Sequence, residues 1–195
     1  MVKKFNNQNH IKIFNLALGD TTSSKNLNIS SNQGLSSSLL SPYLHLNIYE
    51  EIQFTKKEEV RVQKFSNLNI ENVDLLVLDV QGYELNVIKG FEDKIKELKI
   101  IITEINYKEL YKNSANVVDI DNFLLKNGFV RSKTKWHAKK YFGDATYINL
   151  LYLNKFETII YKILNKITIK PSFLFLVDLI NLDFWEDKIR SKILK

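Results

Sequence analysis

Residues 73–90 read VDLLVLDVQGYELNVIKG and show the pattern of a strand, a turn and a helix. Residues 73–80 are almost continuously aliphatic, which is typical of a parallel strand that is covered on both faces. Gly82 follows at once and permits a tight turn. Residues 83–89 then carry apolar side chains at helical spacing, and Gly90 stands where a helix C-terminal cap is expected. The stretch predicts a buried strand that leads directly into a short helix.

The rest of the chain alternates strands and helices around this unit. A second apolar run, Ile100–Ile105, comes shortly after Gly90, and two buried strands joined by a helix make a βαβ unit. We expect further strands at residues 10–18, 60–65 and 145–151 and from 129–131 onward, a helix at 117–127, and a loop at 21–42 holding one short strand at 27–29. This alternation predicts an α/β fold.

Composition narrows the class of protein. The 195 residues, 45% of them hydrophobic, suffice for one domain with a core plus a tail. The formal net charge of +6 favours an anionic partner weakly. The absence of cysteine excludes disulfides and cysteine nucleophiles. The polar start argues against a secretory signal, no apolar run reaches a membrane-spanning length, and no nucleic-acid-binding motif occurs, so we expect a cytoplasmic protein with no transmembrane segment.

The C-terminal part has a different pattern from the domain. We divide the chain into a domain at residues 1–152 and a helical, amphipathic extension at residues 153–195. The apolar residues of the extension recur at spacings of three and four, at Phe156, Ile159, Ile160, Ile163, Leu164 and Ile167. This face can pack on the domain or on a second copy of it. The alternative is a helix on a membrane surface, which fits Lys155, Lys162 and Lys166.

Acidic residues close three of the predicted strands, where open parallel sheets bind ligands. Asp79 is the strongest candidate, because a carboxylate there can accept a hydroxyl proton or hold a positive cofactor, although a helix N-cap explains it equally well. Glu104 ends an isoleucine-rich strand and needs a partner or a crevice, with an exposed loop position as the alternative. Asp20 can be a turn residue. Glu84, in the first turn of the predicted helix, can simply complement the helix dipole.

A basic stretch at residues 131–140 contains five basic residues, one Trp and one His and no acid. It can receive phosphate or uronate groups of a substrate, or it can be a solvated loop. His137 is a potential base without an identified partner.

The stretch at residues 73–90 resembles the signature of FkbM-type methyltransferases, in which a strand ends in Asp-Val-(Glu or Gln)-Gly-x-Glu and the next helix ends in Lys-Gly. Other features resemble the family in the same order: Asn15–Asp20, the Ser-rich Gly34–Leu39, Val60–Phe65, Ile102–Asn106, Asn127–Phe129 and Gly143–Ile148. The resemblance covers residues 10 to 150 and leaves the tail outside.

The resemblance implies a Rossmann-like class I fold and an S-adenosylmethionine-dependent O-methyltransferase. Such enzymes methylate hydroxyls, often of sugars in surface polysaccharides or of secondary metabolites, so the implied partner is a glycan or small-molecule acceptor. Asp79 would stand beside the methyl group and the acceptor hydroxyl, Glu104 near the acceptor, and Asp20 near the adenine. Asp79 and Glu104 are thus the implied catalytic residues, and Asp20, Asp79 and Gln81 the implied cofactor-binding residues. No metal is required.

One feature of the family pattern is missing. The sequence contains no Gly-x-Gly turn, and its first strand corresponds to the family's third. We therefore expect a fold that lacks its first two strands. The alternative function is a truncated, non-catalytic interaction module that pairs with a partner chain or forms a homo-oligomer. A third hypothesis is a glycan-anchoring protein that uses the basic stretch.

Overall fold

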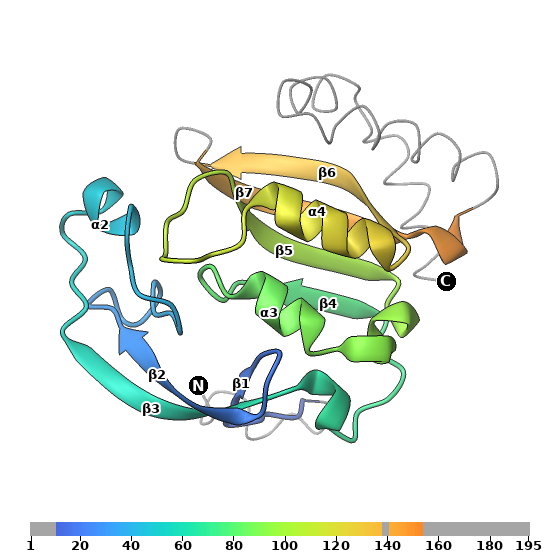
Figure 1. Cartoon of the computed structure of the whole chain (residues 1–195), viewed down its shortest axis with the longest axis horizontal. Helices are drawn as coiled ribbons and strands as arrows, with labels where there is room; N and C mark the ends of the chain where they lie inside the picture. Colours follow the sequence, from blue (N-terminus) through green and yellow to red (C-terminus); the bar gives the residue numbers. More distant parts are fainter. Residues whose placement is uncertain (1–10, 138–140, 154–195) are drawn as a thin grey trace.

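The computed structural model describes residues 11–137 and 141–153 and shows a mixed α/β arrangement with two mixed sheets (Figure 1). One sheet has the strand order β1-β3-β2 and the other the order β4-β5-β7-β6. The strands are β1 Ala17–Leu18, β2 Ser23–Ile29, β3 Lys56–Gln63, β4 Leu75–Leu78, β5 Ile100–Asn106, β6 Phe129–His137 and β7 Phe142–Asn149. The α-helices are α2 His45–Ile48, α3 Glu84–Lys89 and α4 Val117–Lys126, and the 3-10 helices are η1 Phe65–Asn67, η2 Glu92–Glu97 and η4 Leu150–Tyr152.

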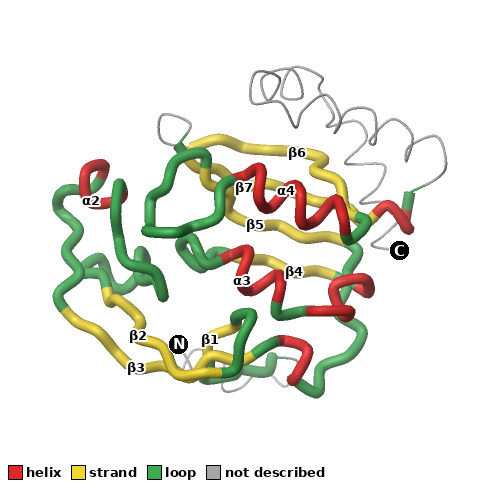
Figure 2. The backbone as a smooth tube through the Cα atoms, in the orientation of Figure 1, coloured by secondary structure: helices red, strands yellow, loops and turns green. Residues whose placement is uncertain are grey.

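The larger sheet contains the predicted βαβ unit. β4 and β5 are parallel neighbours, with Leu76 opposite Ile101, and α3 lies in the connection between them. β7 pairs antiparallel with β5, and β6 pairs antiparallel with β7. In Figure 2, α3 and α4 lie on the same side of this sheet. The βαβ prediction is confirmed.

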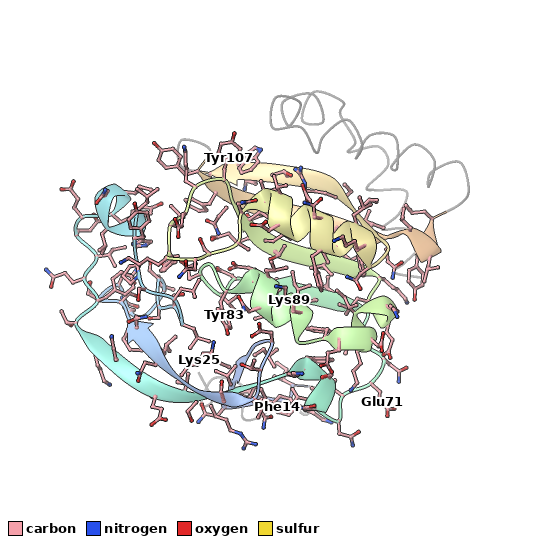
Figure 3. All side chains as sticks on the ribbon, in the orientation of Figure 1. Phe14, Lys25, Glu71, Tyr83, Lys89 and Tyr107 are labelled. Atoms are coloured by element: carbon pink, nitrogen blue, oxygen red, sulfur yellow. The ribbon has the colours of Figure 1, made fainter. Side chains whose placement is uncertain are left out.

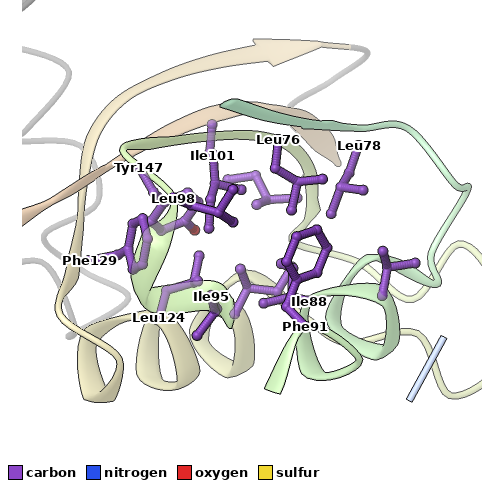
Figure 4. Close-up of a cluster of buried hydrophobic side chains, with 14 of the residues drawn as sticks. Leu76, Leu78, Ile88, Phe91, Ile95, Leu98, Ile101, Leu124, Phe129 and Tyr147 are labelled. Atoms are coloured by element: carbon purple, nitrogen blue, oxygen red, sulfur yellow. The ribbon is translucent and has the colours of Figure 1, made fainter. Parts of the chain in front are cut away.

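The main core lies between this sheet and its helices. Alternation along β5 directs Ile101 and Ile105 toward the helices, and both are fully buried. Figure 4 shows part of this cluster, with Leu76, Ile101 and Phe91 between the strands and the helical segments. At the start of α4, Asn116 and Asp119 form a reciprocal capping box, which fixes where that helix begins.

The smaller sheet is joined to α3 by close backbone contact. β1 pairs parallel with β3, β2 pairs antiparallel with β3, and Gly19 follows β1 directly. A Cβ atom on Gly90 would lie 2.0 Å from the Gly19 carbonyl oxygen. Gly90 does end α3 as predicted, but its φ of −68° is an ordinary helical value. Glycine is required at position 90 because a side chain would collide with the backbone of Gly19, and not because the helix ends in a left-handed conformation.

The prediction that the strand at residues 73–80 is covered on both faces is wrong for the part of the chain that the structure describes. β4 stands at one end of the four-strand order, and its residues alternate between exposed and buried. Leu75 is 50% exposed and Val77 is 63% exposed. The α-helices α3 and α4 pack on this sheet from the opposite face, and a continuous aliphatic run cannot reveal which face of a strand is left uncovered.

Several predicted elements differ in length from those observed. Within the described residues, the strand expected at residues 10–18 is limited to β1, and the region interpreted as a loop at 21–42 contains the full β2. The basic stretch is not a loop over residues 131–137, because β6 extends to His137. Arg131 is buried, with its Nε 3.0 Å from Asp121 Oδ1. Because of this ion pair, the Arg131 guanidinium is already paired within the basic stretch that we predicted could bind an anionic substrate group.

The predicted helical extension at residues 153–195 lies outside the described residues, apart from Leu153. Among the helices that are described, none is both long and apolar enough to cross a membrane.

Replacing Gly90 by alanine tests the contact between α3 and the smaller sheet. We expect Gly90→Ala to lower the free energy of unfolding by roughly 1–3 kcal/mol, because backbone must move to admit the methyl group. Urea unfolding measures the loss. Lys89→Ala, at the exposed neighbouring position, is the control and should stay close to the parent chain; equal stability of both variants would contradict the close approach.

Candidate active site

The turn between β4 and α3 is held by a buried carboxylate. Glu84 Oε1 accepts hydrogen bonds of 3.1 Å from the backbone amides of both Val80 and Gly82. The turn needs this support, because Gln81 and Gly82 both have positive φ, 53° and 94°. Glu84 is only 1% exposed. It therefore organises the turn from inside, and the view that it merely complements the helix dipole is wrong.

Burial raises the pKa of Glu84 to about 7. Hydrogen bonds from its own backbone amide and from those of Gly82 and Val80 act in the opposite direction, because they favour the ionised carboxylate, while nearby Asp79 raises the pKa further.

Asp79 lies at the open side of this turn. Its side chain is exposed, and Gln81 Nε2 donates a hydrogen bond of 2.6 Å to its Oδ1. The N-cap of α3 is Tyr83, which makes no side-chain capping bond. The alternative reading of Asp79 as a helix cap is therefore wrong. Its carboxylate remains accessible at the carboxyl end of β4, where a ligand can reach it.

Glu104 is buried near the carboxyl end of β5. It is 9% exposed, and Asn106 Nδ2 donates a hydrogen bond of 3.4 Å to Glu104 Oε1. Burial raises the pKa of Glu104 to about 8, and the charges of Glu84, Asp79 and Asp144 add to this effect. The loop-exposed alternative for Glu104 is wrong. Below pH 8 this side chain is mainly a neutral acid.

The sheet register brings these acids into one row. Leu78, which precedes Asp79, is opposite Thr103, which precedes Glu104. Glu104 is opposite Asp144, and directly opposed residues of neighbouring strands share a face. The row continues to Lys135 of β6, the partner of Asp144.

His137 gains a partner that its sequence position does not indicate. His137 Nε2 lies 2.7 Å from Asp144 Oδ2. The pair of His137 and Asp144 lies one strand away from Glu104. One imidazole and the carboxylates of Asp79, Glu104 and Asp144 therefore border the same end of the sheet.

Asp20 is placed on the helix side of the turn. Its Oδ2 accepts a hydrogen bond of 3.1 Å from Asn86 Nδ2 of α3. One turn earlier, Tyr83 accepts a 2.8 Å hydrogen bond from Lys25 Nζ, and Figure 3 shows Lys25 and Tyr83 close together between the smaller sheet and α3. Asp20 is thus anchored to the helix that follows the turn, while Asp79 and Glu104 share a sheet face.

The serine-rich segment packs on the same turn, which the sequence alone did not predict. Ser38 Oγ donates to the Gln81 carbonyl at 2.7 Å. The Tyr111 hydroxyl lies 2.9 Å from the Ser36 carbonyl oxygen and 3.0 Å from Gln81 Oε1. No local pattern links these positions, which are separated by up to 75 residues.

Acidic side chains dominate the candidate site, which suits a positively charged ligand group. Within the described residues, no group of three or more His, Asp and Glu is arranged to hold a metal ion. Carboxylates can accept hydrogen bonds, stabilise positive charge and transfer protons.

The chain is similar to known methyltransferases. The methyltransferase FkbM domain family matches residues 3–131. The 2-O-methyltransferase NoeI of Sinorhizobium fredii (strain NBRC 101917 / NGR234) is 29% identical over 112 residues, which cover 52% of this chain and 46% of that protein. The chain thus spans less than half the length of this curated relative. No solved structure matches it significantly.

Removing the Glu84 carboxylate tests its role in the turn. Glu84→Ala leaves two backbone amides without their acceptor, so we expect a loss of roughly 2–4 kcal/mol in the free energy of unfolding. Glu84→Gln keeps a carbonyl oxygen at the same reach and should retain more than half of the lost stability. Urea unfolding of both variants decides this, and an alanine variant as stable as the parent would show that the turn does not depend on Glu84.

The raised pKa of Glu104 makes stability depend on pH. The folded chain keeps the Glu104 proton up to about pH 8, whereas the ordinary pKa is 4.5. Between these values the folded state binds the extra proton, so the free energy of unfolding falls as pH rises. Each pKa unit corresponds to about 1.4 kcal/mol.

Glu104→Gln cannot ionise and should therefore show a smaller loss of stability between about pH 5 and about pH 8.5. Part of the decline should remain, because the pKa of Glu84 is also raised. Glu97→Gln, at an exposed position of η2, serves as the control and should follow the parent curve. Parallel curves for the parent and Glu104→Gln would contradict the raised pKa.

Proposed function

The chain belongs to the methyltransferase FkbM domain family, and we propose that it is an S-adenosylmethionine-dependent O-methyltransferase. The family match confirms the resemblance seen in residues 73–90. The observation that carries the proposal is the accessible carboxylate of Asp79, held at the end of β4 by the Glu84-supported turn. The proposed fold assignment is Rossmann-like, supported by the parallel β4-α3-β5 unit.

The acceptor in this proposal is a hydroxyl of a sugar, a polysaccharide or a secondary metabolite. The similar 2-O-methyltransferase supports oxygen as the methylated atom. An anionic acceptor would be favoured by the exposed Lys133 and Lys135 of β6. We propose the cytoplasm as the place of reaction.

The described residues fit the positively charged part of S-adenosylmethionine. Its sulfonium and ammonium groups need acceptors and negative charge, and Asp79 supplies an exposed carboxylate in a surrounding rich in acids. Gln81 would contribute its side-chain amide from the same turn, and Asp20 would approach from the side of α3. When bound, the cofactor supplies an electrophilic methyl group.

The residues of this chain would then align the acceptor hydroxyl and remove its proton. Asp79 is placed to orient the hydroxyl, because its carboxylate is fixed by Gln81 and open to solvent. Glu104 would accept the proton once ionised, so activity through Glu104 should rise with pH toward its pKa of about 8. The Glu104 carboxylate would take the proton of the acceptor hydroxyl, and the oxygen would then be free to attack the methyl group, which the cofactor would supply by leaving as a neutral thioether.

The second candidate function is a non-catalytic module that pairs with a partner chain. The exposed Leu75 and Val77 of β4 favour it. Calorimetric titration of the full chain with S-adenosylmethionine and with S-adenosylhomocysteine separates the two. Saturable binding supports the methyltransferase, whereas a folded chain that binds neither compound favours the interaction module.

Asp79→Asn tests the proposed catalytic role. We expect methyl transfer from radiolabelled S-adenosylmethionine to a panel of sugars to fall about 100-fold or more. The free energy of unfolding should change by less than about 0.5 kcal/mol, since Asp79 is exposed and does not cap α3. Asp93→Asn, which alters an exposed pair with Lys96, is the matched control. Retained activity in Asp79→Asn would remove Asp79 from the mechanism.

A further inference from the structure

The face of the larger sheet that points away from α3 and α4, here called the outer face, is apolar at one end. Leu75 and Val77 are half or more exposed on it. Their register partners Ile100 and Ile102 stand beside them on β5 and are only partly buried. Parallel strands are normally covered on both faces, yet α3 and α4 cover only the opposite face of this sheet.

The described chain ends on this same outer face. Ile100 is opposite Ile148, which is opposite Val130, so these residues continue the apolar row that begins with Leu75. Leu150 and Leu153, which follow β7, pack against Val130 and Ile148. The chain therefore turns onto the outer face as it leaves the sheet.

A second set of contacts places η4 near the start of β4. Lys99 Nζ lies 5.7 Å from the centre of the Tyr152 ring and 3.0 Å from Asp74 Oδ1. Asp74 immediately precedes Leu75. Tyr152, near the end of the described chain, thus lies close to the start of the exposed apolar patch.

The following sequence has the pattern required to cover this patch. Its apolar side chains fall on one helical stripe, at Phe156, Ile159, Ile160, Ile163, Leu164 and Ile167, and Lys162 lies on the opposite side of that helix. A helix over residues 156–167 would be about 18 Å long. Crossing from β7 to β4 takes about 10 Å, so the segment is long enough to span the patch.

We propose that residues 154–167 form an amphipathic helix that covers the apolar end of the outer face, with Ile159, Ile160 and Ile163 against Leu75, Val77 and Ile102. This assigns an occupant to the exposed face and does not depend on methyl transfer. The acids Asp79, Glu104 and Asp144 occupy the other end of the same face, so the helix would border the candidate site without covering it.

Paired cysteines test the proposal cleanly, because the chain contains no native cysteine. Val77→Cys combined with Ile160→Cys in the full chain should give an intramolecular link with a short bismaleimide, detected by peptide mapping of the monomer. The matched control joins Val77→Cys with Lys162→Cys, on the polar side, and should link at least 5-fold less. Links between two chains would replace the proposal with a second copy as the occupant.

A labelling experiment provides an independent readout. Val77→Cys alone should react slowly with a maleimide dye, and adding Ile163→Asp should raise the rate several-fold, whereas adding Lys162→Asp should leave it unchanged. Fast labelling in every variant, or equal linking of positions 160 and 162, would overturn the proposal. Linking that is lost on adding anionic phospholipid vesicles, with the chain co-sedimenting, would likewise overturn it in favour of a membrane-surface helix.

Discussion

The buried carboxylate of Glu84 is the constraint on which the candidate site depends. Two residues in succession, Gln81 and Gly82, adopt positive φ values, and the amides on either side of Gln81 find their acceptor in this one side chain. An unpaired buried amide is expensive, so the turn and the helix start are coupled. The position of Asp79, the contact of Ser38 and the contact of Tyr111 all follow from the shape of that turn.

Burial also separates the roles of the acids around the turn. Glu84 is enclosed and supports the backbone, Glu104 is enclosed with little hydrogen bonding, and Asp79 is exposed. Since desolvation disfavours charge, the pKa values of the two buried glutamates rise, to about 7 and about 8. The two buried glutamates therefore keep their protons to a higher pH than an ordinary glutamate, which suits a group that exchanges a proton near neutral pH.

Acidic side chains gather at the site although the whole chain carries a net positive charge. The formal net charge is +6, yet Asp79, Glu104 and Asp144 gather at one end of the sheet. The basic stretch that suggested an anionic ligand is partly neutralised, because Arg131 pairs with Asp121 and His137 with Asp144. A cationic ligand group is therefore better matched to this end of the sheet than the overall charge suggests.

Elements with local signals could be predicted from the amino-acid pattern. These elements are the strand, turn and helix at residues 73–90, the second strand at Ile100–Ile105 and the helix that begins at Val117. Each depends on side chains only a few positions apart. Residues 73–90 also carry the resemblance to the family that the family match confirms. Asp79 and Glu104 were also found at strand ends, because the carboxyl end of a parallel strand can be read from an apolar run.

The surroundings of each residue could not be predicted in this way, because they depend on how distant segments pack. Asp79 is not a cap, Glu104 is buried, and Leu75 and Val77 are exposed, although all four stand in or next to similar aliphatic runs. The convergence of Ser38, Tyr111 and Asp144 on the site joins segments that are far apart in the chain. The spacing of apolar residues reflects which side chains share a face of one helix or strand. The burial, pKa and hydrogen-bond partners of a residue depend instead on which distant elements pack against it.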